Sequence, residues 1–148
     1  MNISVDIGRL LTDVGSSLYK SGGTVLDELV QNAQRAKART CHVTFCRAHG
    51  DGEISVLEVS DDGRGLKKAQ DLLKLARSGW DSSVVASDQP FGMGFWSTVT
   101  ATSRVEVRSN DLEITIDADK LHATKSVKGV VTITKTEERY PGFRVRLY

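Results

Sequence analysis

The sequence predicts an α+β domain, a two-layer sandwich in which helices cover one mixed β-sheet. Two observations carry this prediction. Helical and strand patterns occur in groups along the chain and do not alternate as β-α-β units. The 148 residues, 39% hydrophobic and 26% charged, are also enough for one globular domain with a single core.

Two helices come first in the predicted order. Residues 5–19 place apolar side chains on one helical face, and a Ser-Gly-Gly break at residues 21–23 ends that pattern. Residues 25–38 are predicted to form the second helix. Its expected buried positions are Val25, Leu26, Leu29, Val30, Ala33 and Ala36.

Strands dominate the rest of the predicted order. Residues 40–47 and 53–60 read as two strands, and glycines in the turn at 49–52 supply the positive φ that a tight hairpin requires. The remaining predicted elements are a helix at 66–77, a polar segment at 78–89, a short helix at 94–101, and strands at 104–109, 112–117, 129–135 and 143–148.

The polar segment and the last strand carry expectations about motion and extent. Small polar residues at 78–89, next to a glycine-rich turn, predict a mobile lid. The chain ends on an alternating strand, which predicts a domain edge. We therefore expect residues 1–148 to form a single domain, the N-terminal domain of a longer protein.

Charge and composition exclude several classes of function. A net charge of +1 gives no electrostatic footprint for nucleic acid, so direct nucleic-acid binding is not expected. No segment is apolar enough to span a membrane, and the N-terminus lacks a signal-peptide pattern. Cys41 and Cys46 fall on opposite faces of one strand, so they are expected to be reduced thiols in a cytoplasmic protein.

The first motif that carries chemistry is a pair of polar residues on the second helix. Glu28 and Asn32 are four residues apart and therefore project from the same face. An amide oxygen is a suitable ligand for Mg²⁺, and a nearby carboxylate can take a proton from an attacking water. A solvated polar face is the alternative, but the dyad borders the apolar face through Leu29, Val30 and Ala33.

The second motif is the sequence Asp-Asp-Gly-Arg-Gly at residues 61–65. Asp61 ends an apolar strand, and a carboxylate at that place needs a hydrogen-bond partner such as the exocyclic amine of adenine. Gly63 and Gly65 would let the backbone approach a flat base and turn sharply. A plain Asp-Asp-Gly turn, with Asp62 in solvent, remains the alternative.

The third motif is a glycine-rich turn, Phe-Gly-Met-Gly-Phe at residues 91–95, in front of a helix. Unpaired N–H groups at a helix N-terminus form an anion site when glycines expose them. The lysine of a P-loop is absent, and no β-α-β unit precedes the glycines as a Rossmann fingerprint would require. The motif therefore predicts phosphate binding without a phosphate-loop lysine.

Together the three motifs resemble those of the GHKL superfamily, which comprises gyrase, the ninety-kilodalton heat-shock chaperone, histidine kinases and MutL. The resemblance is strongest to the chaperone branch and covers nearly the whole chain. Its matching stretches are residues 17–33, 75–79, 89–97, 104–107 and 142–145. The implied fold is the Bergerat ATP-binding fold.

The resemblance assigns roles to these residues. It implies Glu28 as the general base, Asn32 as the Mg²⁺ ligand and Asp61 as the residue that reads adenine. Gly65 and Leu66 would flank the base. The residues expected to contact the nucleotide are Asn32, Asp61, Gly63, Gly65, Leu66, Arg77, Gly92, Met93, Gly94 and Phe95.

Four positions differ from the residues that are usual in the family. Arg35 stands where an Asp is common, three residues after the Asn of the first motif. Asp62 replaces a frequent Asn, and Phe143 stands where a Thr usually helps to bind adenine. Arg77 stands where the family often has a lysine that contacts phosphate.

The predicted function is Mg²⁺-dependent binding and slow hydrolysis of ATP, with a nucleotide-controlled lid that drives conformational change or dimerisation. The expected partners are ATP or ADP, a second copy of the chain and attached downstream domains. A GHKL protein kinase that phosphorylates histidine or serine is one alternative. It is disfavoured because histidine kinases generally carry Asn where Glu28 stands. A non-catalytic nucleotide sensor is the other.

Overall fold

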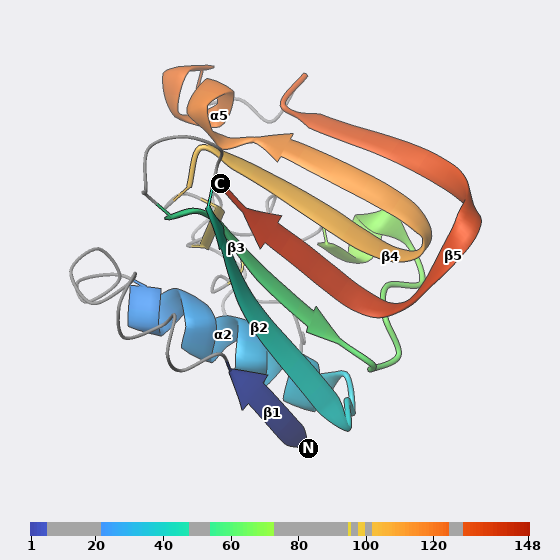
Figure 1. Cartoon of the computed structure of the whole chain (residues 1–148). Helices are drawn as coiled ribbons and strands as arrows, with labels where there is room; N and C mark the ends of the chain where they lie inside the picture. Colours follow the sequence, from blue (N-terminus) through green and yellow to red (C-terminus); the bar gives the residue numbers. More distant parts are fainter. Residues whose placement is uncertain (6–21, 48–53, 73–94, 96–97, 100–101, 125–128) are drawn as a thin grey trace, which may run out of the picture.

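The computed structural model describes residues 1–5, 22–47, 54–72, 95, 98–99, 102–124 and 129–148 (Figure 1). Five strands and two helices are assigned in these ranges. In chain order they are β1 (Asn2–Val5), α2 (Gly22–Arg35), β2 (Thr40–Arg47), β3 (Ile54–Asp61), β4 (Arg104–Asp117), α5 (Ala118–Thr124) and β5 (Val131–Leu147).

The strands form one sheet with the order β1-β2-β3-β5-β4. β1 pairs with β2 in parallel, and the other three pairs are antiparallel, so the sheet is mixed. Figure 1 shows α2 against one face of the sheet at its β1–β3 end. Leu29 and Ala33 of α2 belong to the same buried cluster as the strand residues of that face. The α+β class predicted from the sequence is confirmed.

The inner face of the sheet is built from rows of cross-strand partners, which lie on one face because side chains alternate along each strand. Two rows are entirely apolar and buried. They are Phe45, Leu57, Leu147 and Val105, and next to them Val43, Val59, Val145 and Val107. The third row contains Cys41, Asp61 and Phe143. A carboxylate therefore continues the core pattern at one end of the sheet.

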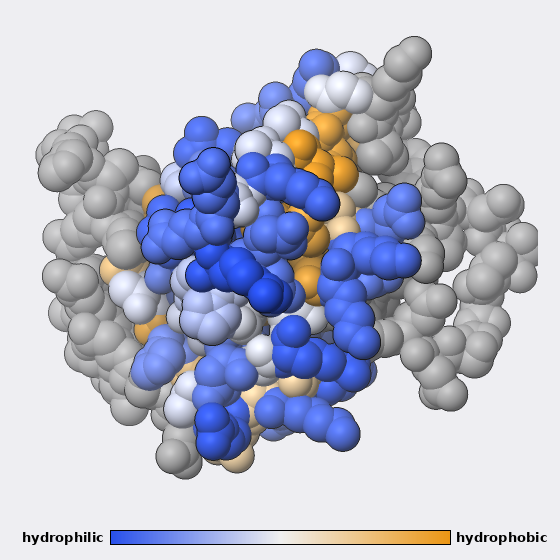
Figure 2. Space-filling model, turned by 90° about the vertical axis from the view of Figure 1, so that its right-hand side faces the viewer, coloured by the Kyte–Doolittle hydropathy of each residue, from blue (hydrophilic) through white to orange (hydrophobic). Residues whose placement is uncertain are grey.

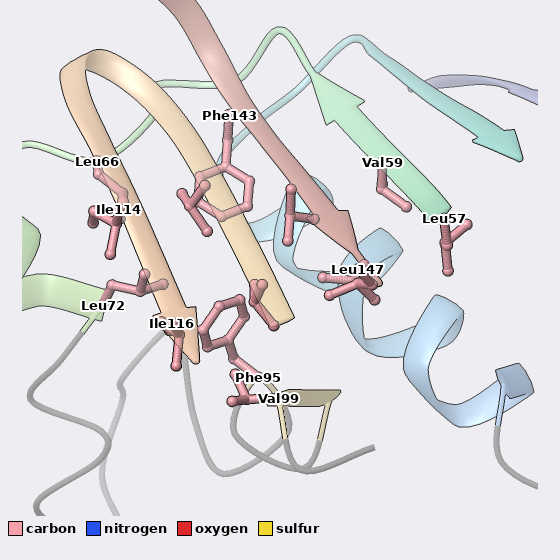
Figure 3. Packing of buried hydrophobic residues seen from close by; sticks show 14 of the residues in the cluster. Leu57, Val59, Leu66, Leu72, Phe95, Val99, Ile114, Ile116, Phe143 and Leu147 are labelled. Atoms are coloured by element: carbon pink, nitrogen blue, oxygen red, sulfur yellow. The ribbon is translucent and has the colours of Figure 1, made fainter. Parts of the chain in front are cut away.

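Apolar side chains from outside the sheet complete the core. In Figure 3, Phe95 and Val99 reach toward the sheet beside Ile116, and Phe143 points from β5 into the same cluster. Leu66 and Leu72, from the segment after β3, are also buried in it. Leu29 and Ala33 of α2 are buried as predicted, and so is Ala36 just after the helix. Val25, Leu26 and Val30 pack against the core partly buried.

β4 and β5 form a long irregular pair. Their register shifts on both sides of Asn110, where β5 carries more residues than β4. Pro141 and Gly142 lie in this irregular stretch, which suits proline because it lacks a ladder donor. Figure 2 looks onto this side of the molecule and shows mainly hydrophilic residues around a narrow hydrophobic strip. Ile133 of β5 is 46% exposed.

Several element boundaries differ from the predictions. The four strands predicted after residue 103 form two continuous strands, β4 and β5. Asn110, with φ 53°, bends β4 without ending it, and the bulged residues keep β5 continuous. The helix α5 was not predicted, since its seven residues are too few for a clear helical period. The second helix begins at Gly22 and ends at Arg35, and Lys37 just beyond it has φ 60°.

The N-terminal prediction was wrong at its first residue. Val5 is the last residue of β1, whose parallel pairing with β2 no local pattern indicates. The rest of the predicted helix at 5–19, the turn at 49–52 and the lid at 78–89 lie outside the described residues. Of the predicted helices at 66–77 and 94–101, residues 69–72 and residues 95, 98 and 99 are helical. Among the described helices, none has the length and apolar character needed to cross a membrane.

Candidate functional site

The polar dyad lies on α2 beside the face that packs on the sheet. Asn32 is buried, with 5% of its surface exposed, and the Glu28 side chain is 20% exposed. Arg35 reaches back over both of them. Its Nη1 lies 3.9 Å from Glu28 Oε1 and 3.5 Å from Asn32 Oδ1, the long limit of a hydrogen bond. A guanidinium therefore lies next to the acceptor oxygens of both Glu28 and Asn32.

The amide nitrogen of Asn32 is an unusual feature of this face. Asn32 Nδ2 is buried and has no hydrogen-bond partner among the described residues. Buried donors without a partner are rare in folded proteins, and each one needs an explanation. An acceptor oxygen of a bound ligand, such as a phosphate, would satisfy it.

The oxygen atoms of Glu28 and Asn32 on this face of α2 also suit a hard cation. Asn32 Oδ1 and the carboxylate of Glu28 are oxygen ligands of the kind that Mg²⁺ prefers. No group of three His, Cys, Asp or Glu side chains in the described ranges could hold a metal by itself. An ion at Asn32 would therefore take its other ligands from water and phosphate oxygens, as Mg²⁺ commonly does.

Asp61 closes the inner face of the sheet at the end of β3. It is 8% exposed, and this burial raises the pKa of its carboxyl above the usual value of 3.8. A hydrogen bond from the Gly63 N–H to Asp61 Oδ1, 2.8 Å long, limits the rise of that pKa, and the nearby charge of Asp62 adds to it. Cys41, its partner on β2, is a free thiol whose pKa burial and the charge of Asp61 raise to about 11.

Asp62 has a different environment from its neighbour. Its carboxylate is exposed, and Oδ1 accepts the backbone N–H groups of Arg39 at 2.7 Å and Thr40 at 2.8 Å. These bonds lower the pKa of Asp62, because they favour the charged form. Asp62 thus fastens the end of β3 to the start of β2 and is not merely solvated.

The loop after Asp61 joins the sheet to the helix that carries the dyad. A methyl group at Gly63 would lie 2.8 Å from the Cβ of Ala36, so this loop packs directly on the end of α2. The Arg64 N–H also donates to the Ala36 carbonyl at 3.1 Å, and Ala36 is one helical turn after Asn32. The second motif therefore lies against the helix of the first.

Ser109 and Asn110 of β4 hold the other side of this loop. Ser109 Oγ accepts the Leu66 N–H at 2.8 Å and donates to the Gly142 carbonyl at 2.5 Å. Asn110 Nδ2 donates to the Leu66 carbonyl at 2.7 Å. These two residues were not identified from the sequence. The signal that could have identified them is a Ser-Asn pair in the middle of an alternating strand pattern.

Two glycines make the close packing of this loop possible. Gly65 has φ 65°, and a methyl group there would lie 2.6 Å from both Ser109 Oγ and the Gly142 carbonyl. Gly142 has φ 91°, and a methyl group would lie 1.9 Å from the Asp61 carbonyl oxygen. The requirement for glycine at residue 65 therefore has a cause within the protein itself.

The remaining predicted site residues divide into two groups. Leu66 and Phe95 are buried in the core at 1% and 0% exposure. The backbone N–H and carbonyl of Leu66 are already bonded to Ser109 and Asn110. Phe143 is the register partner of Asp61 and fills the core beside it. Arg77, Gly92, Met93 and Gly94 lie outside the described residues.

A separate hollow of about 560 Å³ lies at the opposite end of the sheet. Arg104, Asp117, Asp119 and Tyr148 are among the residues that line it, and none of the predicted site residues that the structure describes does. The guanidinium of Arg104 stacks on the Tyr148 ring at 4.0 Å within this hollow. It is a feature of the β4–α5 junction and not of the dyad.

Comparison with known proteins agrees with these features. The profile of the family "Histidine kinase-, DNA gyrase B-, and HSP90-like ATPase" matches residues 19–141, which include all three motifs. Three relatives each carry the name "Chaperone protein HtpG". They come from Gluconobacter oxydans (strain 621H), Actinobacillus succinogenes (strain ATCC 55618 / DSM 22257 / CCUG 43843 / 130Z) and Methylobacterium sp. (strain 4-46).

The similarity to these relatives extends over most of this chain but only part of theirs. The Gluconobacter protein is 30% identical over 98% of this chain and 27% of its own length. The Actinobacillus protein is 26% identical over 100% of this chain and 28% of its own length. The Methylobacterium protein is 33% identical over 70% of this chain and 21% of its own length. The chain thus spans about a quarter of the length of the relatives that it matches.

Proposed function

Because the chain belongs to the family of histidine kinase-, DNA gyrase B- and HSP90-like ATPases, we propose that it binds Mg²⁺–ATP and hydrolyses it slowly. The observation that carries this proposal is the buried carboxylate of Asp61, which lies in the row next to the two apolar rows of the sheet. It lies on the sheet face that α2 covers, and the loop that follows it packs on the helix that bears Asn32. Family membership supports ATP binding and hydrolysis in general.

Asp61 is proposed to recognise the adenine base. A carboxylate is an acceptor, and the exocyclic amine of adenine is a donor of matching size. Burial makes an unpaired carboxylate unfavourable, and a hydrogen bond from the base would offset this. A side chain at Gly63 would lie 2.8 Å from Asp61 Oδ1, so glycine at this position leaves that carboxylate oxygen uncovered.

Asn32 and Glu28 are proposed to act at the phosphate end. Asn32 Oδ1 would hold Mg²⁺, and its unpartnered Nδ2 would donate to a phosphate oxygen. When bound, the ion supplies charge neutralisation for the phosphates. Glu28 would take the proton of the attacking water, the usual role of a carboxylate at this place. Backbone N–H groups at residues 92–95 and the side chain of Arg77 are proposed to hold the phosphates.

The consequence of nucleotide binding is proposed to be mechanical. Ordering of residues 78–89 as a lid would convert contact with the γ-phosphate into a change of surface, and a second copy or downstream domains would respond to it. The task that we propose for this change of surface is remodelling of other proteins, as by a chaperone, since all three relatives are named as chaperone proteins. We propose that residues 1–148 act as a single nucleotide-binding domain.

The test of this proposal separates binding from hydrolysis. Calorimetric titration should detect Mg²⁺–ATP binding by the chain and by Glu28→Ala, while single-turnover hydrolysis by Glu28→Ala should fall about 100-fold or more, as expected for loss of a general base. Asp27→Ala, at an exposed neighbouring position on α2, is the matched control and should hydrolyse ATP normally. Hydrolysis by Glu28→Ala at the parent rate would contradict the assigned base. Transfer of labelled phosphate to protein would favour a kinase instead.

A further inference from the structure

Arg35 places a permanent positive charge beside Asn32 Oδ1, the oxygen that is proposed to hold the metal. Its Nη1 lies 3.5 Å from Asn32 Oδ1 and 3.9 Å from Glu28 Oε1. Arginine stays protonated in proteins and has only donors, so it cannot ligate a cation. It can only occupy the same acceptor atoms that a cation would use.

The same charge has opposite effects on the two ligands of the site. A guanidinium this close to Asn32 Oδ1 repels a divalent cation and competes with it for the oxygen lone pairs. It attracts the phosphates of a nucleotide that arrives without a metal. Both effects reduce the difference in affinity between metal-bound and metal-free nucleotide.

The exposure of Arg35 makes this a competition and not a block. Its side chain is 48% exposed, and contacts of such half-exposed pairs are weak and readily exchanged. The guanidinium can therefore move from Asn32 into solvent or toward a phosphate when an ion binds. Where it moves toward a phosphate, Arg35 remains in the site as a second cation.

We propose that Arg35 determines the metal dependence of this site by competing with Mg²⁺ for Asn32 Oδ1 and contributing its own charge to the nucleotide phosphates. The inference rests on the proposed nucleotide site. It assigns Arg35 the role of a specificity-determining residue, which weakens the coupling between Mg²⁺ and nucleotide binding. The quantity that reports it is the ratio of the nucleotide dissociation constant in EDTA to that in excess Mg²⁺.

The experiment measures this ratio by calorimetric titration of ADP, which avoids hydrolysis, into the parent and four variants. Arg35→Gln and Arg35→Met remove the charge, Arg35→Lys retains it, and Arg39→Gln is the matched control. Arg39 loses the same charge in the control, but its side chain is 92% exposed and pairs with Asp62 at 3.8 Å. Circular dichroism establishes that each variant is folded.

The expected result is that the ratio rises about tenfold in Arg35→Gln and Arg35→Met, the scale of removing one nearby screened charge. Arg35→Lys should remain nearer the parent, and Arg39→Gln should equal it. A ratio in both neutral variants that matches the parent would overturn the proposal. An equal rise in Arg39→Gln would also overturn it, by showing a general effect of net charge. Failure of the parent to bind ADP in either condition would instead overturn the nucleotide site itself.

Discussion

The two ends of the proposed site are built in different ways. The end around Asp61 is fixed by sheet register and by bonds in which the backbone takes part, from Gly63 to Asp61 and from Leu66 to Ser109. The end around Asn32 lies on a single helix, where the half-exposed side chain of Arg35 contacts Glu28 and Asn32. Asn32 Nδ2 has no partner among the described residues. The proposed base recognition is therefore tied to folding, while the proposed metal end can change by substitution of one side chain such as Arg35.

The largest expected effect comes from breaking the Asp61 end through its backbone. Gly142→Ala would place a methyl group 1.9 Å from the Asp61 carbonyl at φ 91°, so it should lower the free energy of unfolding by about 3–5 kcal/mol. Gly129→Ala is the control, since Gly129 also has positive φ, 73°, but its nearest neighbour would be the flexible Lys120 Nζ at 3.5 Å. It should lose only about 1 kcal/mol. Urea unfolding measures both, and equal losses would show that the contact with Asp61 is unimportant.

A smaller effect is expected when the loop loses its side-chain anchor. Ser109→Ala leaves the buried Leu66 N–H without its acceptor and should lower the free energy of unfolding by about 1–3 kcal/mol. Ser103→Ala removes a hydroxyl that donates to the Tyr148 carbonyl at an exposed site, where the backbone N–H of Ser103 donates as well. That control should stay within about 0.5 kcal/mol of the parent. If the two serine variants unfolded at the same urea concentration, the loop would not depend on Ser109.

The smallest expected effect is a contrast in pH dependence between two adjacent carboxyls. The raised pKa of Asp61 means that this group lowers stability as the pH rises from 3.8 through its folded value. The lowered pKa of Asp62 means that this group stabilises the fold above 3.8 and loses its effect as the pH falls through its folded value. From about pH 3 to about pH 7, Asp61→Asn should therefore gain stability relative to the parent and Asp62→Asn should lose it. Urea unfolding across that range measures both, and slopes of the same sign would contradict the assigned environments.

Much of the Asp61 end could be predicted from the sequence, because an apolar strand followed by Asp-Asp-Gly predicts both the burial of Asp61 and the turn after it. The residues that hold the loop could not be predicted, since Ser109 and Gly142 meet it only through long-range pairing of β4 and β5. β1 was missed for the same reason, as its partner β2 lies far along the chain. At the other end, helix spacing gave Glu28 and Asn32 a common face, but it did not reveal that Arg35 reaches both.

The most direct test of the account is calorimetric titration of ADP with Mg²⁺ into Asp61→Asn and Asp62→Asn. Both substitutions remove one negative charge from adjacent residues, but only Asp61 faces the buried side of the sheet. Asp61→Asn should weaken binding about 100-fold, the scale of a charged hydrogen bond, and Asp62→Asn should change it by less than about threefold. Equal affinities for the two variants, or a larger loss in Asp62→Asn, would contradict base recognition by Asp61.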